Sequence, residues 1–228
     1  MRQRPREPLS SVHEPKPPGY YAEARANVIE ELPAPLGRVL DVGCGEGGAN
    51  GPLRARGATW ISGIELLPEP AARAAERYDE VEVGDAVDAL ERVTGRFDTM
   101  LCYDVLEHLV DPAILVRRLR RVASPRARLH VSVPNARHYS LARDLVFRGT
   151  FGYADWGHRD ATHLRWFTRR DATRLLEAAG WSVVSTVPSA SHRLQELKLP
   201  VPGRIVNGLG GEFFSRAWYI LATATDGA

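Results

Sequence analysis

The stretch RVLDVGCGEGGANG, residues 38–51, decides which fold this chain is predicted to have. Residues 38–42 contain a short run of valine and leucine, which is typical of a strand buried on both faces of a parallel sheet. Gly43, Gly45 and Gly48 follow with the G-x-G-x-x-G spacing of a dinucleotide-binding turn, and glycines let the backbone approach a ligand closely. The stretch therefore predicts a strand and a cofactor-binding loop, but the spacing alone does not identify the cofactor.

Further strands and helices alternate along most of the chain. The other expected strands are short apolar runs at residues 59–66, 80–85, 97–105, 127–135, 181–188 and 216–224. Helix start signals lie between them, because Asp111 is an N-cap before Pro112 and Thr168 begins a capping box. This alternation predicts an α/β fold with a Rossmann-like, doubly wound sheet of seven strands, mostly parallel. Since no clear helical stripe joins the last two strands, we expect the last strand to run antiparallel.

Length and composition indicate a single domain. The 228 residues carry a formal net charge of +2, which is too small to indicate a nucleic-acid partner, and two cysteines, too few for a disulfide framework. Residues 1–18 are rich in proline and lack an apolar core, so we expect a disordered or extended lead-in and not a secretory signal. No run approaches the roughly 18 apolar residues of a membrane span. We expect one domain over residues 19–228, located in the cytoplasm, with no membrane partner.

Acidic residues near the expected ligand edge of the sheet favour one cofactor over another. Glu65 ends the second strand about 20 residues beyond the loop, where a carboxylate can accept hydrogen bonds from both hydroxyls of an adenosine ribose. Asp85 follows the third strand and could accept from an exocyclic amine, or cap a helix, or both. Asp41 and Glu46 lie close to the loop, where they would oppose a pyrophosphate, which needs bare N–H groups. They suit a cationic ligand such as S-adenosylmethionine, which has a sulfonium, an ammonium and no phosphate.

Several motifs together resemble those of a known family. The segments VLDVGCGEG, GIEL, VGDA and FDTMLCYDVLEHL are similar, in order and spacing across residues 38–133, to the successive motifs of class I S-adenosylmethionine-dependent methyltransferases. Within that superfamily, DVLEHLVDP, SVPN and DATHLRWFT resemble bacterial small-molecule methyltransferases near the ubiquinone-biosynthesis O-methyltransferase group, and methyltransferases associated with glycan modification. The chain departs from the pattern at GGANGP, where Gly51 and Pro52 stand at the usual start of a longer helix.

The resemblance implies a set of cofactor contacts. The methionine portion would be lined by Asp41, Gly43, Cys44 and Gly45, and the adenosine by Glu65, Leu66, Asp85 and Ala86. Tyr103 and the residues after it, through Leu106 and His108, would lie beside the cofactor where the methyl group points. The product would be S-adenosylhomocysteine.

An acceptor site is expected where the methyl group leaves the cofactor. His108 follows the fourth strand, and residues 135–168 form an insertion after the fifth strand that we expect to be a helical cover over the acceptor. His108 and His163 are the catalytic candidates, with His163 the preferred acceptor contact. The expected substrate-binding residues are Tyr20, Tyr21, Arg25, His138, Tyr139, His158, Arg165 and Trp166. For the first three, ordinary packing explains the sequence equally well.

A metal and a general base are both open as ways to activate the acceptor. His158, Asp160 and His163 could ligate a divalent metal, but their spacing matches no recognised ligand motif, so no metal is predicted. A hydroxyl acceptor benefits from a general base, and the histidines could supply one.

The predicted function is O-methylation of a small hydroxylated molecule such as a sugar or natural product, with N-methylation open. An NAD-dependent oxidoreductase is the first alternative, although the chain has no Tyr-x-x-x-Lys pair. A non-catalytic methyltransferase-like partner subunit is the second, and Glu65 and Asp85 argue against it. A nucleic-acid methyltransferase is disfavoured by the near-neutral charge. The oligomeric state is open, and a homodimer is compatible with the sequence.

Overall fold

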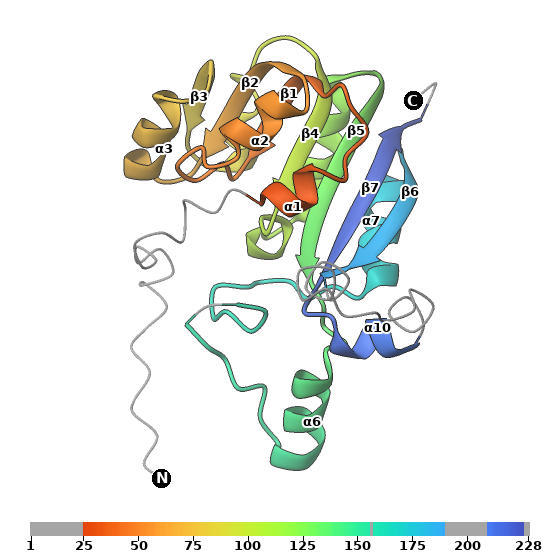
Figure 1. The fold of residues 1–228 in the computed structure, drawn as a ribbon. Coiled ribbons are helices and arrows are strands. Elements are labelled where there is room, and N and C mark those ends of the chain that lie inside the picture. Colours follow the sequence, from red (N-terminus) through yellow and green to blue (C-terminus); the bar gives the residue numbers. More distant parts are fainter. Residues whose placement is uncertain (1–24, 156, 190–208, 226–228) are drawn as a thin grey trace.

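The computed structural model describes residues 25–155, 157–189 and 209–225, and within them seven strands form one sheet (Figure 1). The strand order is β3-β2-β1-β4-β5-β7-β6. The strands are β1 (Gly37–Val42), β2 (Ala58–Glu65), β3 (Glu80–Val83), β4 (Phe97–Tyr103), β5 (Ala123–Pro134), β6 (Trp181–Pro188) and β7 (Ala217–Ala224). All pairings are parallel except those of β7, which runs antiparallel to β5 and β6. The predicted doubly wound sheet with an antiparallel last strand is confirmed.

The helices begin where the sequence places start signals. Asp111 accepts a hydrogen bond from the Ala113 N–H (3.0 Å), and Thr168 accepts one from the Asp171 N–H (3.2 Å), so both expected N-caps are formed. The described helices are α1 (Ala26–Ile29), α2 (Asn50–Ala55), α3 (Pro68–Ala75), α4 (Ala86–Ala89), α5 (Pro112–Arg121), α6 (Tyr139–Arg148), α7 (Arg169–Ala178) and α10 (Leu209–Phe214), with a 3-10 turn η3 (Leu106–His108). The helix after the glycine loop, α2, is short, as the GGANGP departure suggested.

Alternate residues of the central strands enter two separate apolar clusters. On β1, Val39 packs in a cluster with residues of α1, α2 and α3, whereas Leu40 and Val42 pack with residues of α4, α5 and α7. Neighbouring strand residues point to opposite faces, so a strand covered on both faces needs apolar residues without interruption. This double burial fixes the sheet and, with it, the position of the loops at its carboxyl edge.

The insertion after β5 leaves the sheet at the carboxyl ends of the parallel strands. Its helix α6 projects away from the sheet in Figure 1, and the chain then returns toward β4 as irregular structure with isolated bridges at Asn135–Phe167 and Ala154–Asp160. Within the described residues, the expected helical cover therefore contains one helix of ten residues, and the other described residues form loops. Residues 1–18, and Tyr20 and Tyr21, lie outside the described residues.

One strand begins earlier than expected. β5 starts at Ala123 and includes Pro125, and its pairing with β4 is irregular between the Phe97–Ala123 and Thr99–Arg128 pairs. Arg126 has φ of 59° inside this irregularity. Proline is tolerated there because a bulged residue need not donate a ladder hydrogen bond.

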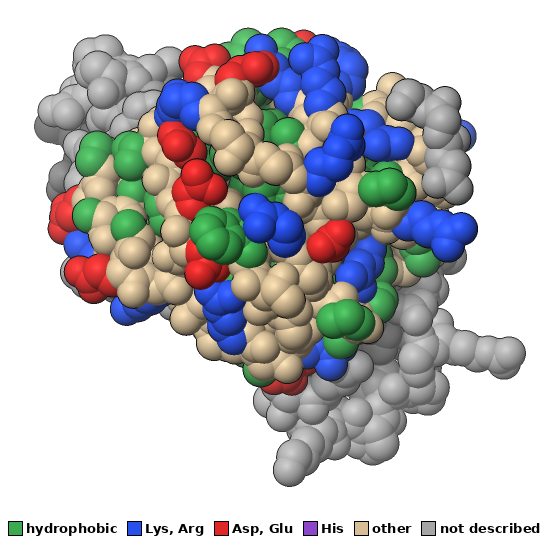
Figure 2. Space-filling model, turned by 90° about the horizontal axis from the view of Figure 1, so that it is seen from above, with side chains coloured by type: hydrophobic (Ala, Val, Ile, Leu, Met, Phe, Trp, Pro, Cys, Tyr) green, Lys and Arg blue, Asp and Glu red, His purple; other side chains and the backbone are tan. Residues whose placement is uncertain are grey.

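The surface opposite the insertion carries mixed charge. Figure 2 looks onto that face, where arginine side chains are spread with acidic side chains among them. Some of the chain's arginines bind backbone carbonyls, such as Arg96 on Ala123 O at 2.7 Å and Arg118 on Val87 O at 2.6 Å. Among the described helices, none has the length and hydropathy needed to cross a bilayer.

Candidate active site

The glycine loop has backbone conformations that only glycine adopts readily. Gly43, Gly45 and Gly47 have φ of 73°, 55° and 71°, so the third constrained glycine is Gly47 and not the Gly48 of the sequence pattern. A Cβ on Gly43 would lie 2.6 Å from Cγ2 of Val105. The Gly43 and Cys44 N–H groups donate to Ile64 O at 2.8 and 3.1 Å, which ties the loop to the end of β2.

Glu65 lies against this loop, as the sequence predicts. Its Oε2 accepts from the Gly45 N–H at 2.9 Å, and its Oε1 accepts from the Leu67 N–H at 3.0 Å. Each carboxylate oxygen has a second lone-pair direction, so both can still accept from hydroxyls of a ribose. Leu66, the next residue, is 44% exposed and presents an apolar surface beside this carboxylate.

Two acids beside the loop have different surroundings. Asp41 is buried and accepts a hydrogen bond from the Tyr78 hydroxyl at 2.6 Å. Burial raises the pKa of Asp41 to about 6, although Tyr78 and Arg25 act in the opposite direction. Glu46 is instead paired with Arg73 at 3.0 Å. The negative charge available to a cation at the loop therefore comes mainly from Asp41 and Glu65.

In the structure Cys44 is a buried thiol in the wall of the loop, and Asp85 is the N-cap of α4. Burial raises the pKa of the Cys44 thiol far above its usual range, so this side chain is an uncharged, unreactive part of the loop wall. Asp85 caps α4 through a hydrogen bond from the Val87 N–H to Oδ1 at 2.9 Å, next to Ala86. The Asp85 side chain is exposed, so its second oxygen remains accessible at the end of β3.

The end of β4 is covered by Arg25. The Arg25 guanidinium forms an ion pair with Asp104 (2.5 Å) and lies 5.5 Å from the centre of the Tyr103 ring. Asp104 has φ of 52°, and its Oδ1 accepts from the Ser132 hydroxyl at 2.8 Å. Arg25 is thus placed at the edge where a ligand would lie, while the Tyr103 hydroxyl is hydrogen-bonded to His130 Nδ1 at 2.7 Å.

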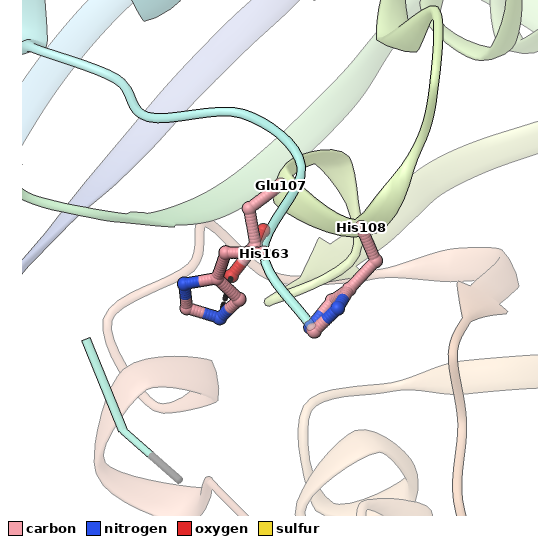
Figure 3. A group of neighbouring side chains, drawn as sticks. All are labelled: Glu107, His108 and His163. Carbon is pink, nitrogen blue, oxygen red and sulfur yellow. Dashed lines mark ion pairs between the residues drawn. The ribbon is translucent and has the colours of Figure 1, made fainter. Parts of the chain in front are cut away.

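Glu107, His108 and His163 form a compact cluster directly after β4 (Figure 3). The His163 Nε2 lies 4.0 Å from Glu107 Oε1, and the two imidazole rings lie 4.8 Å apart. The backbone N–H groups of Leu164 and Arg165 donate to Glu107 O at 2.8 and 3.0 Å, which holds the returning insertion against η3. Residues that are more than fifty positions apart in the sequence, such as Glu107 and Leu164, therefore lie in contact here.

The Glu107 carboxyl is in an unusual environment. It is completely buried, and within the described part of the chain neither of its oxygens has a hydrogen-bond partner. Burial, with a further contribution from Asp104, raises its pKa well above the usual value near 4.5. Buried carboxyls without partners are expensive in free energy, and they concentrate at functional sites.

The cluster fits a divalent cation as well as acid–base chemistry. One atom from each of the three side chains can be chosen so that all lie within 4.8 Å of one another. Two imidazoles and one carboxylate are a common donor set for zinc and for open iron or manganese sites. The set considered from sequence, His158, Asp160 and His163, does not form such a group among the described residues; His158 packs instead on His138, with ring centres 4.8 Å apart.

The remaining predicted substrate residues lie on the insertion. His138 and His158 are linked through the Ser140 hydroxyl at 2.8 and 3.3 Å, and burial lowers the pKa of both, to about 4 for His158. The Tyr139 ring contacts Phe214 of α10 at 5.5 Å, and the Trp166 ring contacts Phe151 at 5.1 Å. Arg165 donates to Val110 O. The histidines of the insertion therefore divide between a neutral pair and the Glu107 cluster.

Three residues of this site were not singled out by the sequence prediction: Tyr78, and also Asp104 and Glu107, which lie within the stretch from Tyr103 to His108 that was expected beside the cofactor. Glu107 could have been selected from the sequence, because it immediately precedes His108 and follows a predicted strand whose carboxyl end lies at the edge of the sheet where ligands bind. Tyr78 gave no such signal, because nothing in the local sequence shows that it reaches Asp41.

The comparisons with known proteins agree with this geometry. A family model described as a methyltransferase domain matches residues 17–186. The chain is 36% identical over 120 residues to the ubiquinone biosynthesis O-methyltransferase of Pseudomonas paraeruginosa (strain DSM 24068 / PA7), covering 49% of this chain and 50% of that protein. It is 36% identical over 140 residues to the protein of that name from Ralstonia nicotianae (strain ATCC BAA-1114 / GMI1000), covering 53% and 58%.

A solved structure is similar over most of its length. The crystal structure of an S-adenosylmethionine-dependent methyltransferase from Mesorhizobium loti superposes with a TM-score of 0.62 at 18% identity, covering 88% of this chain and 98% of that chain. At this identity the likeness shows the fold. The chain matches only about half the length of the curated relatives named above.

Proposed function

The chain belongs to the class I S-adenosylmethionine-dependent methyltransferases, and from this premise we propose that it transfers the methyl group of that cofactor to a hydroxyl of a small molecule. The observation that carries the proposal is the cluster of buried Glu107 and His163 with half-buried His108 at the carboxyl end of β4. A buried carboxyl without a hydrogen bond is costly in free energy, and its place beside two histidines fits an enzyme that must remove a proton from a hydroxyl. The relatives described above are ubiquinone biosynthesis O-methyltransferases, which supports the same reaction type.

The cofactor would lie along the carboxyl ends of β1, β2, β3 and β4. In the proposal its methionine portion contacts Asp41, Gly43, Cys44 and Gly45, its adenosine contacts Glu65, Leu66, Asp85 and Ala86, and its methyl group points past Tyr103 and Leu106. The support is positional: the backbone N–H of Gly45 is already held by Glu65, so the loop and the ribose acid are pre-organised relative to each other.

Methyl transfer is a displacement in line with the breaking S–C bond. The acceptor oxygen forms a bond to the methyl carbon, the sulfur keeps the electron pair of the broken bond, and the hydroxyl proton leaves to a base. We assign the proton to His163, with Glu107 beside its Nε2 and His108 packed on its ring. A divalent cation held by these three residues would instead lower the pKa of a bound hydroxyl, and His163 would then be a ligand and not the base.

The insertion would bind the acceptor. Five predicted substrate residues lie on it: His138, Tyr139, His158, Arg165 and Trp166. Arg25, which precedes β1 in the chain, covers the end of β4. Aromatic and polar side chains in this combination suit a small hydroxylated molecule, such as a sugar or a natural product. The buried, free thiols of Cys44 and Cys102 are compatible with the cytoplasmic location we propose.

The proposal is tested in two stages. Calorimetry should show that S-adenosylhomocysteine binds to the protein, whereas NAD does not; the reverse result would refute the cofactor assignment. Incubation with S-adenosylmethionine and a library of hydroxylated and amino acceptors should give products methylated on oxygen. Methylation confined to amino acceptors, with the hydroxylated ones unchanged, would contradict the reaction type.

A further inference from the structure

Tyr78 lies beneath the glycine loop and holds its buried acid. The residue follows α3, where its N–H donates to Ala74 O at 2.9 Å, and its side chain is 6% exposed. Its hydroxyl donates to Oδ2 of Asp41 at 2.6 Å, a short distance typical of a hydrogen bond to a charged oxygen.

The Tyr78 ring is also part of the loop's support. A Cβ on Gly47 would meet Cε1 of Tyr78 at 3.3 Å, and a Cβ on Gly63 would meet Cδ2 at 3.0 Å. The ring is therefore packed closely between the loop and β2, so its hydroxyl has little freedom to move away from Asp41. The packing of the ring therefore holds the Tyr78 hydroxyl against the Asp41 carboxylate.

The charges facing Asp41 leave it close to the balance between its two forms. Burial and the nearby Glu65 carboxylate favour the neutral acid, while the Tyr78 hydroxyl and the Arg25 guanidinium favour the anion. Cys44 and Tyr103 also face this carboxyl, but burial raises the pKa of both well above their usual values, so they stay uncharged at any ordinary pH. With a pKa of about 6, Asp41 responds to a bound cation.

We propose that Tyr78 is a positioning residue that keeps Asp41 ready to ionise, so that S-adenosylmethionine binding is coupled to release of a proton from Asp41. The inference rests on the proposed position of the methionine portion beside Asp41. When the cation binds, the neutral acid loses its proton to solvent, and the anion faces the ammonium and sulfonium. After methyl transfer the sulfur is uncharged, so the product S-adenosylhomocysteine holds Asp41 in its anionic form less strongly.

The test measures cofactor binding by calorimetry between pH 5 and 8.5, in two buffers of different ionisation enthalpy. For the wild type, proton release should accompany S-adenosylmethionine binding near and below pH 6 and should vanish by pH 8. S-adenosylhomocysteine should release fewer protons at the same pH. Proton release that is zero across the range would overturn the proposal, whereas absence of any cofactor binding would refute the proposed function itself.

Tyr78→Phe removes the hydroxyl and keeps the ring. Loss of one hydrogen bond to a charged group raises the Asp41 pKa by about one unit. The affinity for S-adenosylmethionine should then fall about fivefold at pH 6 and by less than about 1.2-fold at pH 8, because Asp41 is ionised in both proteins at the higher pH. A loss of equal size at both values of pH would mean that Tyr78 acts only through packing.

Two further variants separate charge from structure. Asp41→Asn should abolish the proton release, and Tyr78→Phe added to it should cause no further change with pH. Tyr153→Phe makes the same chemical change on the insertion and should leave the pH profile of cofactor binding as it is in the wild type. If the double variant still shows the pH-dependent loss seen in Tyr78→Phe, the effect does not pass through Asp41 and the proposal fails.

Discussion

Replacing Glu107 by leucine should make the protein more stable and nearly inactive. The side chain is completely buried, and no hydrogen bond to either carboxyl oxygen is present within the described residues. An unpaired buried polar group costs about 1–3 kcal/mol, and leucine fills a similar volume without that cost. For a domain of this size the gain corresponds to a rise in Tm of roughly 2–12 °C.

The activity should change in the opposite direction. If Glu107 acts with His163 on the acceptor proton, Glu107→Leu should lower kcat by about 100-fold or more, while S-adenosylhomocysteine still binds with wild-type affinity. Thermal unfolding, calorimetry and methyl transfer to an identified acceptor measure the three quantities on the same preparation. Glu76→Leu, on the exposed surface, is the matched control and should change Tm and activity little.

The stability difference should also depend on pH. The pKa of Glu107 is raised in the folded protein, so protonation of this group favours the folded state. The free energy of unfolding therefore falls as pH rises from about 4.5, the usual pKa of a glutamate, toward the higher pKa of Glu107 in the folded protein. The advantage of the leucine variant should therefore grow with pH in that window. A variant that is less stable than the wild type by more than about 1 kcal/mol and fully active would show that Glu107 is an ordinary structural residue.

Three other predictions concern the acid beside the glycine loop, the Glu107 cluster and the histidine pair of the insertion. Glu65→Gln keeps the shape of the side chain but removes the negative charge that accepts hydrogen bonds from the Gly45 N–H and, in the proposal, from the ribose. Calorimetry should show that S-adenosylhomocysteine binds this variant about 10-fold or more weakly. The control, Glu82→Gln on the neighbouring strand, should bind S-adenosylhomocysteine with wild-type affinity. Because the proton is assigned to the His163 imidazole, chelation with EDTA should leave methyl transfer unchanged; a loss of activity that added Mn²⁺ restores would show instead that the three side chains hold a cation. Because the pKa of His158 is lowered to about 4, mainly by burial, the folded protein should lose stability as pH falls from about 6.5 to 4, and urea unfolding should show a smaller loss for His158→Gln.

The sequence by itself determined the frame of this protein. Uninterrupted apolar runs predicted buried parallel strands, the N-caps at Asp111 and Thr168 placed two helices, and the spacing from the glycine loop to Glu65 predicted a carboxylate beside it. These features depend on neighbouring residues or on the fixed geometry of a parallel sheet, so local patterns are sufficient to find them.

Tertiary structure alone decided which side chains meet at the edge of that frame. The contact of Glu107 with His163 depends on how the insertion returns to η3, and the hydrogen bond from Tyr78 to Asp41 depends on how closely α3 packs on β2. Both join residues that are dozens of positions apart, and no local propensity encodes where a loop closes or a ring comes to rest. Packing sets those distances, and burial then sets the protonation of Glu107 and Asp41.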